Sequence, residues 1–316
     1  MYDWIVLSLL ATSLAPVASA GVLAALGRQA TPQRVSRISI GFTLLTTLGA
    51  LGMLAAVLKT PGFEPRYVDL FGASAVLDPL SAAMSVLVAG ISLVVHVYAS
   101  RYMADEPGFA RFFALLDLMT AAILWMMSSA NMLLLLAAWF AVGQILYFLL
   151  GHNTERPSAG RYAFWTFITF RIGDLPLVGA ALLLAHGYGS WELGTVFERI
   201  AQNPSAQLGG VAVVPAAGLL IALAAFARSA QFPLHTWLPY TMDGPTPVSA
   251  LMHAGIVNAG GFLFNRFAPL FIHTPDVLHL AFIVGLITAL IGSALMLTQN
   301  DIKKSLGYST MGQMGF

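Results

Sequence analysis

The chain has 316 residues, of which 58% are hydrophobic and only 9% are charged, and its mean hydropathy is +0.79. Because about a quarter of the residues in an average soluble domain are charged, this composition indicates an integral membrane protein. The net charge of +1 gives no reason to expect a nucleic-acid partner, and the absence of cysteine excludes disulfides, thiolate metal sites and iron–sulfur clusters. We therefore expect no redox chemistry and no cofactor in this chain.

Apolar stretches of roughly 20 residues recur along the chain, separated by short polar segments, as the thickness of a bilayer requires of spanning helices. The expected fold class is an all-α polytopic membrane protein. We predict helices over residues 3–27, 37–58, 78–102, 109–129, 131–151, 161–185, 209–241 (broken), 246–272 and 275–298, with another opening at about 302. Between them, "YVDLFGASAVLD" alternates as a short hairpin would, and "WELGTVFERIAQ" has the spacing of a short amphipathic helix.

The basic residues of the loops predict that the N-terminus faces outward, because most of them then lie on the cytoplasmic side of a cell inner membrane. The first apolar run has no basic region before it and is long enough to span, so we interpret it as a retained helix rather than a cleaved signal. The last helix stops about a dozen residues after it opens, with no polar exit, so we expect the chain to be a fragment of a longer protein.

Arg228 ends the apolar run "VVPAAGLLIALAAFAR", and Pro233 and Pro239 follow it. Charge at membrane depth is costly, which makes Arg228 a functional candidate. Proline removes a backbone donor and clashes with the preceding turn, so we predict a break in this helix at about residues 228–241. Discontinuous helices build ion and substrate sites near the midplane of transporters. The alternative is an arginine that extends towards water from a helix end beside a structural kink.

Two histidines accompany the predicted break. His253 lies about two turns after "GPTP" in the next helix, and in a hydrated cavity it can pass a proton between two half-channels. The alternative for His253 is a buried ring bound to a backbone carbonyl. His235 lies inside the break and either relays protons or satisfies the carbonyls that the prolines free. Asn258 offers a neutral polar group further along the helix of His253.

Arg171 and Asp174 are spaced i, i+3, so they share a helix face and are expected to form a buried ion pair, either as a brace or as part of ion coupling. Asp117 has no partner within four residues on its own helix. It either finds one on a neighbouring helix, such as Arg171 or Arg228, or stays protonated. His96 lies near the inner end of its helix, where we expect an interfacial position.

"QNDIKKSLGYSTMGQ" opens the last predicted helix. Lys303 and Lys304 follow its cap, and we expect one to face the bundle interior while the other reaches water. Burial lowers the pKa of a lysine enough for it to release a proton, so both are candidates for ion translocation.

Several of these stretches carry a resemblance to a known family. "RSAQFPLHTWLPYTMDGPTPVSALMHAGIV" and "TQNDIKKSLGYSTMGQMGF", together with "RIGD" at 171–174 and "HVYASRYM" at 96–103, resemble the antiporter-like membrane subunits of NADH-quinone oxidoreductase (complex I) and of Mrp-type sodium/proton antiporters. The resemblance extends from about residue 78 onward. Within that superfamily, "MHAGIVNAGGFLFNRFAPLF" is most similar to the DabB subunits of DabA/DabB inorganic carbon pumps.

The resemblance implies two inverted five-helix repeats, each with a broken helix that forms a half-channel. It divides the chain into three N-terminal helices over 1–108, a complete first repeat over 109–272 and the start of the second over 273–316. In the family, a glutamate on the second helix of the repeat pairs with a lysine on the broken helix, and a histidine or lysine on the next helix passes the proton on.

This chain departs from that pattern at three positions. Phe140 stands where relatives have the glutamate, with Gln144 as the nearest polar group; Arg228 stands for the lysine, and Asn258 for a lysine of some Mrp relatives. Arginine does not release its proton at physiological pH, so Arg228 acts only as a fixed charge. A channel that lets cations flow down their gradient tolerates these losses better than a pump does.

The leading interpretation is a proton-conducting, or sodium-conducting, subunit of an inorganic carbon uptake complex, with His253, His235 and the polar residues around Arg228, Asp174 and Asp117 as the path. The resemblance implies a large soluble partner, DabA-like and similar to carbonic anhydrase, which holds the zinc. One alternative is a proton-pumping subunit of NADH-quinone oxidoreductase or an Mrp-type antiporter. The other is a structural membrane anchor with an inactive half-channel. In none of these is the chain itself an enzyme.

Overall fold

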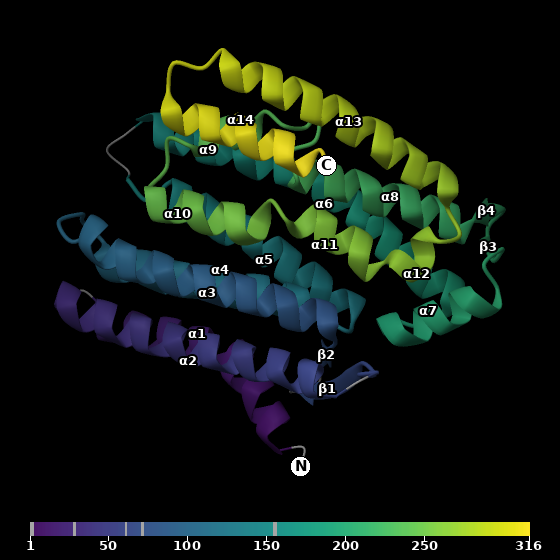
Figure 1. Cartoon of the computed structure of the whole chain (residues 1–316), viewed down its shortest axis with the longest axis horizontal. Coiled ribbons are helices and arrows are strands. Elements are labelled where there is room, and N and C mark those ends of the chain that lie inside the picture. Colours follow the sequence, from purple (N-terminus) through teal and green to yellow (C-terminus); the bar gives the residue numbers. More distant parts are fainter. Residues whose placement is uncertain (1–2, 28–29, 61, 71–72, 154–156) are drawn as a thin grey trace.

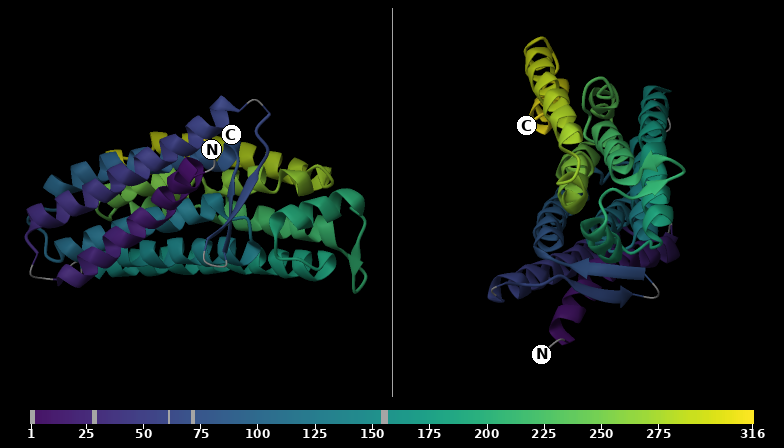
Figure 2. Two further views of the ribbon diagram at one scale, coloured as in Figure 1. Left: turned by 90° about the horizontal axis from the view of Figure 1, so that it is seen from below. Right: turned by 90° about the vertical axis from the view of Figure 1, so that its right-hand side faces the viewer.

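The helices lie side by side with their long axes in one general direction, so the molecule is an elongated bundle (Figures 1 and 2). In this computed structural model the described residues are 3–27, 30–60, 62–70, 73–153 and 157–316. Within them, eight helices are long and apolar enough to cross a membrane, and α8 (Val213–Arg228) is a shorter apolar helix. The predicted all-α polytopic fold is confirmed.

Four helices form the N-terminal part of the bundle: α1 (Asp3–Leu26), α2 (Pro32–Lys59), α3 (Pro79–Tyr102) and α4 (Phe109–Ser128). The second begins at Pro32 rather than at the predicted residue 37. Thr31 explains this earlier start, because its hydroxyl caps the helix by accepting a hydrogen bond from the Arg34 N–H, and proline suits the first helical position. α1 and α2 approach so closely at Gly49 that a Cβ there would lie 2.7 Å from Thr12 Oγ1.

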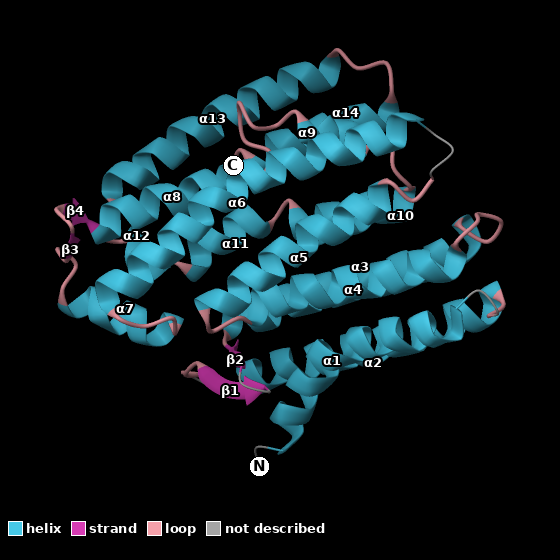
Figure 3. Ribbon diagram, turned by 180° about the vertical axis from the view of Figure 1, so that it is seen from behind, coloured by secondary structure: helices cyan, strands magenta, loops and turns pink. Residues whose placement is uncertain are grey.

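Short elements cover one end of the bundle (Figure 3). They are the antiparallel pair β1 (Arg66–Leu70) and β2 (Ala73–Leu77), the helix α7 (Leu193–Gln202), and the two-residue strands β3 (Gln207–Leu208) and β4 (Val211–Ala212). The predicted hairpin and amphipathic helix are therefore confirmed. They are tied to the bundle by backbone hydrogen bonds, such as that from the Leu193 N–H to the Ala130 carbonyl at 2.8 Å.

The predicted break in the seventh span is confirmed. After α5 (Met132–Leu150) and α6 (Pro157–Tyr188), α8 ends at Arg228 and helical structure resumes only at α9 (Trp237–Thr241). In Figure 1 these two pieces lie in different halves of the bundle, joined by an irregular loop. The prolines thus have the effect that their chemistry predicts.

The next span is interrupted too, which the sequence did not indicate. Residues 246–272 were expected as one helix, but the structure divides them into α10 (Thr246–Leu251), the π-helical turn η2 (Met252–Ile256), α11 (Ala259–Arg266) and α12 (Ala268–Phe271). In the π turn the Val257 N–H donates to the carbonyl of Met252, five residues back, at 3.1 Å. An apolar pattern does not distinguish this wider turn from an α-helical one, and such turns frequently occur at functional sites.

The last two helices are α13 (Pro275–Leu297) and α14 (Ile302–Met314). Asp301 caps α14 through hydrogen bonds to its carboxylate from the N–H groups of Lys303 and Lys304. α14 packs against α13 and α9, so the C-terminal helix lies next to the broken span.

Candidate ion-translocation site

The end of α8 is a defined reversal of the backbone. The Gln231 N–H donates to the carbonyl of Phe226 at 2.9 Å, which is the closing bond of a Schellman ending. Ala230 lies in the left-handed region, with a φ of 51°, at the position where glycine is usual. The chain therefore leaves Arg228 at the tip of a helix that stops inside the bundle.

Side chains satisfy the carbonyls that this ending frees. Trp237 Nε1 donates to the carbonyl of Ala227 at 3.0 Å, and Gln231 Nε2 donates to that of Ser229 at 3.2 Å. Buried backbone carbonyls need such partners at membrane depth. His235 also has a backbone hydrogen bond, at Pro233, so Trp237 and Gln231 share this role with it.

Ser229 joins the two interrupted spans. Its hydroxyl donates to the carbonyl of Val257 at 2.5 Å and accepts from the Gly260 N–H at 3.1 Å. Val257 directly follows the π turn, and Gly260 lies in the first turn of α11. The end of α8 and the irregular part of the next span are therefore held together by one side chain.

Arg228 is buried, with 2% of its surface exposed, and shares the carboxylate of Asp174 with a second arginine. Arg228 Nη2 lies 3.1 Å from Asp174 Oδ1 and 3.0 Å from the carbonyl of Trp139. Arg171 Nη2 lies 2.7 Å from Asp174 Oδ2, so the predicted i, i+3 pair is confirmed. Trp139 Nε1 also donates to Asp174, at 2.6 Å.

Aromatic rings surround both guanidinium groups. The Arg228 group lies 4.2 Å from the ring centroids of Trp139 and of Phe170. The Arg171 group lies 4.8 Å from the ring of Phe140, the residue at the family's glutamate position. A ring face attracts a cation, so an aromatic ring replaces the expected carboxylate as the neighbour of a positive charge.

Gly143 makes the approach of the two arginines possible. A Cβ at this position would lie 2.7 Å from Arg171 Nη2 and 3.6 Å from Arg228 Nη1. The cluster of Arg171, Asp174 and Arg228, here called the arginine cluster, thus sets two permanent positive charges against one carboxylate. Unlike a lysine–glutamate pair, it has a surplus positive charge that proton release does not remove.

His235 and His253 both follow the arginine cluster along the chain. His253 belongs to η2 and is partly buried, and its Nδ1 has no hydrogen-bond partner among the described residues. The Nδ1 of His235 is in the same situation. Asn258 donates to the carbonyls of His253 and Ala254, at 3.1 and 2.9 Å, and so stabilises the π turn.

Asp117 has the expected partner on a neighbouring helix, but the suggested partners Arg171 and Arg228 are wrong. Its partner on a neighbouring helix is His96, whose Nε2 lies 3.1 Å from Asp117 Oδ1. Neither residue has exposed surface. The expected interfacial position of His96 is wrong as well, because four helices meet around the pair: the hydroxyls of Ser19 on α1 and Ser39 on α2 also donate to Asp117.

Lys303 and Lys304 both lie at the start of α14. Lys303 Nζ donates to the carbonyl of Gly244, in the loop between α9 and α10, at 2.7 Å. Both side chains are partly buried. Lys303 thus connects the last helix to the segment that follows the break.

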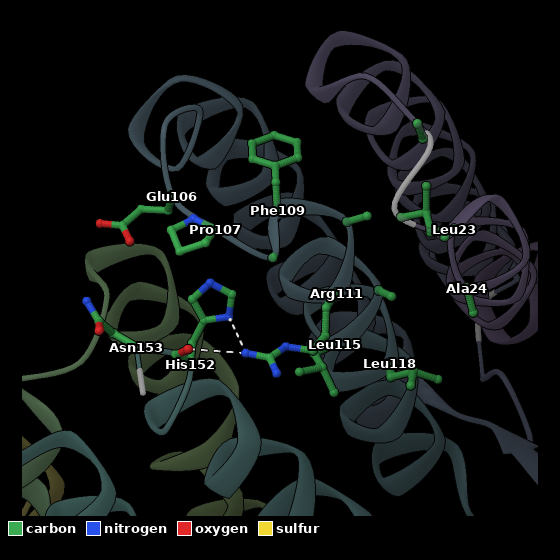
Figure 4. A pocket seen from close by; sticks show the side chains of 15 residues that line it. Leu23, Ala24, Glu106, Pro107, Phe109, Arg111, Leu115, Leu118, His152 and Asn153 are labelled. Atoms are coloured by element: carbon green, nitrogen blue, oxygen red, sulfur yellow. Dashed lines mark hydrogen bonds between the residues drawn. The ribbon is translucent and has the colours of Figure 1, made fainter. Parts of the chain in front are cut away.

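A cavity of about 790 Å³ opens between α1, α4 and the end of α5 (Figure 4). Leu23 and Ala24 line one side of it, and Arg111 and His152 the other. Arg111 Nη2 donates to the His152 carbonyl at 3.1 Å. His152 lies beyond the end of α5, where burial and then the Arg111 charge lower the pKa of its imidazole.

Sequence reasoning missed Trp139, Ser229 and His96. Trp139 precedes the missing glutamate, but nothing in the sequence shows that its ring N–H bonds to Asp174 on another helix. Ser229 resembles any serine at a helix end. For His96 a signal existed, because an unpaired aspartate on a neighbouring span needs a donor, and a histidine is able to supply one.

Family models match most of the chain. Residues 129–316 match the model described as "NADH:quinone oxidoreductase/Mrp antiporter, TM", and residues 71–113 match "NADH-Ubiquinone oxidoreductase (complex I), chain 5 N-terminus". Over 286 residues the chain is 60% identical to the "Probable inorganic carbon transporter subunit DabB1" of Halothiobacillus neapolitanus, which covers 90% of this chain and 51% of that protein. It is 41% identical over 242 residues to the "NAD(P)H-quinone oxidoreductase chain 5" of Synechocystis sp., which covers 76% of this chain and 36% of that protein.

Solved structures agree with these similarities. The chain superposes on a chain of the Mrp complex from Dietzia sp. with a TM-score of 0.81 and 28% identity, over 96% of this chain and 33% of that one. The archaeal membrane-bound sulfane sulfur reductase gives a TM-score of 0.85 at 20% identity, over 98% of this chain and 63% of that one, and at that identity the match shows the fold alone. The chain spans about half, or less, of the length of the two sequence relatives.

Proposed function

The chain belongs to the family of membrane subunits that NADH:quinone oxidoreductases and Mrp antiporters share, and we propose that it conducts protons across the membrane as part of a complex. The proposed path uses the imidazoles of His235, inside the break after α8, and of His253, in the π turn of the next span, because an imidazole is able to accept and donate a proton. Arg228 is the fixed positive charge beside this path, and it does not itself release a proton.

The junction of two interrupted spans carries this proposal. Ser229 joins the end of α8 to the π-helical span, so the break after α8 and the π turn that contains His253 are neighbours in the structure. The unpartnered Nδ1 atom of His253 favours water in this region, because a buried polar atom normally finds a protein or water partner. Water and two imidazoles together supply what proton transfer requires.

We further propose that the ion flux serves inorganic carbon uptake, as the name of the relative at 60% identity suggests. In such a complex the protons run inward down their gradient through this chain. The energy drives a soluble partner of the carbonic-anhydrase type, which hydrates carbon dioxide in one direction. The zinc belongs to that partner, since the described residues of this chain hold no group of three or more His, Cys, Asp or Glu side chains suited to a metal ion.

Replacement of His253 tests the conduction proposal. In the full-length protein with its partners, His253→Ala is expected to leave assembly intact and to lower ion-dependent transport at least tenfold, because the path loses a titratable group. The matched control is His186→Ala, at an exposed position in the last turn of α6. A His253→Ala complex that assembles and transports at the normal rate would favour the structural anchor instead.

A second candidate function is proton pumping within an NADH:quinone oxidoreductase. The match of residues 71–113 to the chain 5 N-terminus favours it, whereas Phe140 and Arg228 disfavour it, because the glutamate and lysine of the pump pattern are absent. Affinity purification of the full-length protein from its native membrane distinguishes the two. A soluble zinc protein as the main partner supports carbon uptake, and a set of quinone-enzyme subunits supports the pump.

A further inference from the structure

The buried pair of His96 and Asp117 stands apart from the path described above. It lies among α1, α2, α3 and α4, whereas the break follows α8. In the described contacts of this pair, the other polar side chains are serine hydroxyls, which are not ionisable. The proton content of this pair follows from which atoms are able to donate.

His96 Nδ1 carries a proton. It lies 2.7 Å from the main-chain carbonyl of Ser92, and a carbonyl oxygen accepts hydrogen bonds but never donates them. The other ring nitrogen, Nε2, faces Asp117 Oδ1 at 3.1 Å. This contact is within ion-pair distance, although its geometry is not that of a hydrogen bond.

The hydroxyl groups around the pair favour one charge state of the carboxyl group. Ser19 Oγ donates to Asp117 Oδ2 at 2.6 Å, and Ser39 Oγ lies 2.9 and 3.0 Å from the two carboxylate oxygens. Hydrogen bonds donated to a carboxylate favour its ionised form. A protonated His96 ring would complete an ion pair with this carboxylate. Beyond the ring, Ser92 Oγ lies 3.2 Å from Nδ1 and 2.7 Å from Thr120 Oγ1, so the hydrogen-bonded network continues between α3 and α4.

The cavity of about 790 Å³ gives this pair a neighbouring source of water. Leu23, which lines it, is one helical turn from Ser19 on α1, and Leu118, which also lines it, directly follows Asp117 on α4. One turn of helix is about 5.4 Å along the axis. The buried carboxylate of Asp117 thus lies a short distance from a cavity that is open to solvent.

We propose that His96 and Asp117 form a second proton-binding site, which exchanges a proton through the cavity between α1 and α4 during transport. The incoming proton adds to the Asp117 carboxylate and breaks its ion pair, so the site alternates between net charges of zero and plus one. This inference rests on the proposed function in one respect, which is that the chain moves ions at all.

A purely structural pair makes a different prediction, and a double apolar variant separates the two. Replacement of a buried ion pair by apolar groups of similar volume is often neutral or stabilising. We therefore expect the full-length His96→Leu/Asp117→Leu protein to assemble with its partners and to lose transport at least tenfold. The matched control is Thr46→Val on α2, a buried hydroxyl that bonds only within its own helix in the described contacts. It should keep the normal rate.

If the double variant does not assemble, Asp117→Asn decides. The amide has the same shape and still accepts from Ser19 and Ser39, but it does not take up a proton in the physiological range. Assembly with a tenfold loss of transport supports the proposal, and assembly with a rate within twofold of normal overturns it, as does failure of both variants to assemble. His253→Ala keeps the two proposals separate: loss there with normal transport in the pair variants overturns only this one, whereas normal transport in all variants overturns the proposed function.

Discussion

Two buried carboxylates in this bundle have opposite surroundings. Asp174 is shared by two arginines and a tryptophan N–H, whereas Asp117 faces one histidine and two serine hydroxyls. At Asp174 both cations are permanent, because guanidinium does not deprotonate in proteins. At Asp117 the cation is titratable. The first arrangement fixes a field inside the membrane, whereas the histidine of the second exists in a neutral or a protonated form.

Asp174→Asn is the change with the largest expected effect, and it tests the fixed half of this comparison. It leaves two partly or fully buried guanidinium groups without a carboxylate. Removing one partner of a buried ion pair costs about 3–5 kcal/mol. We expect a strong loss of thermal stability and of assembled protein, measured by melting of the purified full-length complex.

Asp117→Asn is the natural comparison for that measurement. Its neighbour His96 is a ring that exists in a neutral as well as a protonated form, so no permanent charge is left unpaired, and the loss of stability should be clearly smaller. Equal losses of thermal stability in Asp174→Asn and Asp117→Asn would contradict the distinction between arginine partners, which are always charged, and a histidine partner, which is not.

Gly143→Ala is expected to have an intermediate effect confined to the arginine cluster. The new methyl group would lie 2.7 Å from Arg171 Nη2 and would displace that guanidinium from Asp174. Overpacking of this kind costs about 1–3 kcal/mol. Gly90→Ala on α3 is the control, since a Cβ there meets nothing within 4 Å. Equal melting temperatures for the two variants would contradict the close approach of the two arginines.

The smallest effect concerns pH, at the cavity beside the titratable pair. Burial and Arg111 lower the pKa of His152 in the folded state below its ordinary value of about 6.5. The unfolded chain therefore binds more protons in this range, so stability falls as pH drops below about 6.5. His152→Gln should flatten the melting temperature between pH 7 and pH 5. A slope as steep as that of the parent protein would show that other groups cause it.

Much of this fold follows from composition and spacing. The length of each apolar run predicts its helix, and Pro233 and Pro239 predict the break, because a missing N–H and a fixed φ act locally. The ion pair of Arg171 and Asp174 was predictable for the same reason, since i, i+3 neighbours share a helix face.

Partners that come from other helices were not predictable in this way. Arg228 joins Asp174 across 54 residues, and Ser39 reaches Asp117 across 78. A single sequence shows that a buried charge needs a partner, but it does not show the packing that selects this partner. Arg171 and Arg228 were therefore suggested as partners of Asp117, whereas the structure has His96 in that place. The π turn was missed because one additional residue per turn leaves an apolar pattern almost unchanged.

The hydroxyl of Ser229 has a mechanical consequence. This one oxygen is hydrogen-bonded to the backbone of Val257 and of Gly260 in the neighbouring span. The end of α8 and the segment after the π turn are therefore attached to each other at a single point. A shift of either piece strains or releases the other. As long as both hydrogen bonds persist, a backbone movement of the π turn that contains His253 is transmitted to the helix end that carries Arg228.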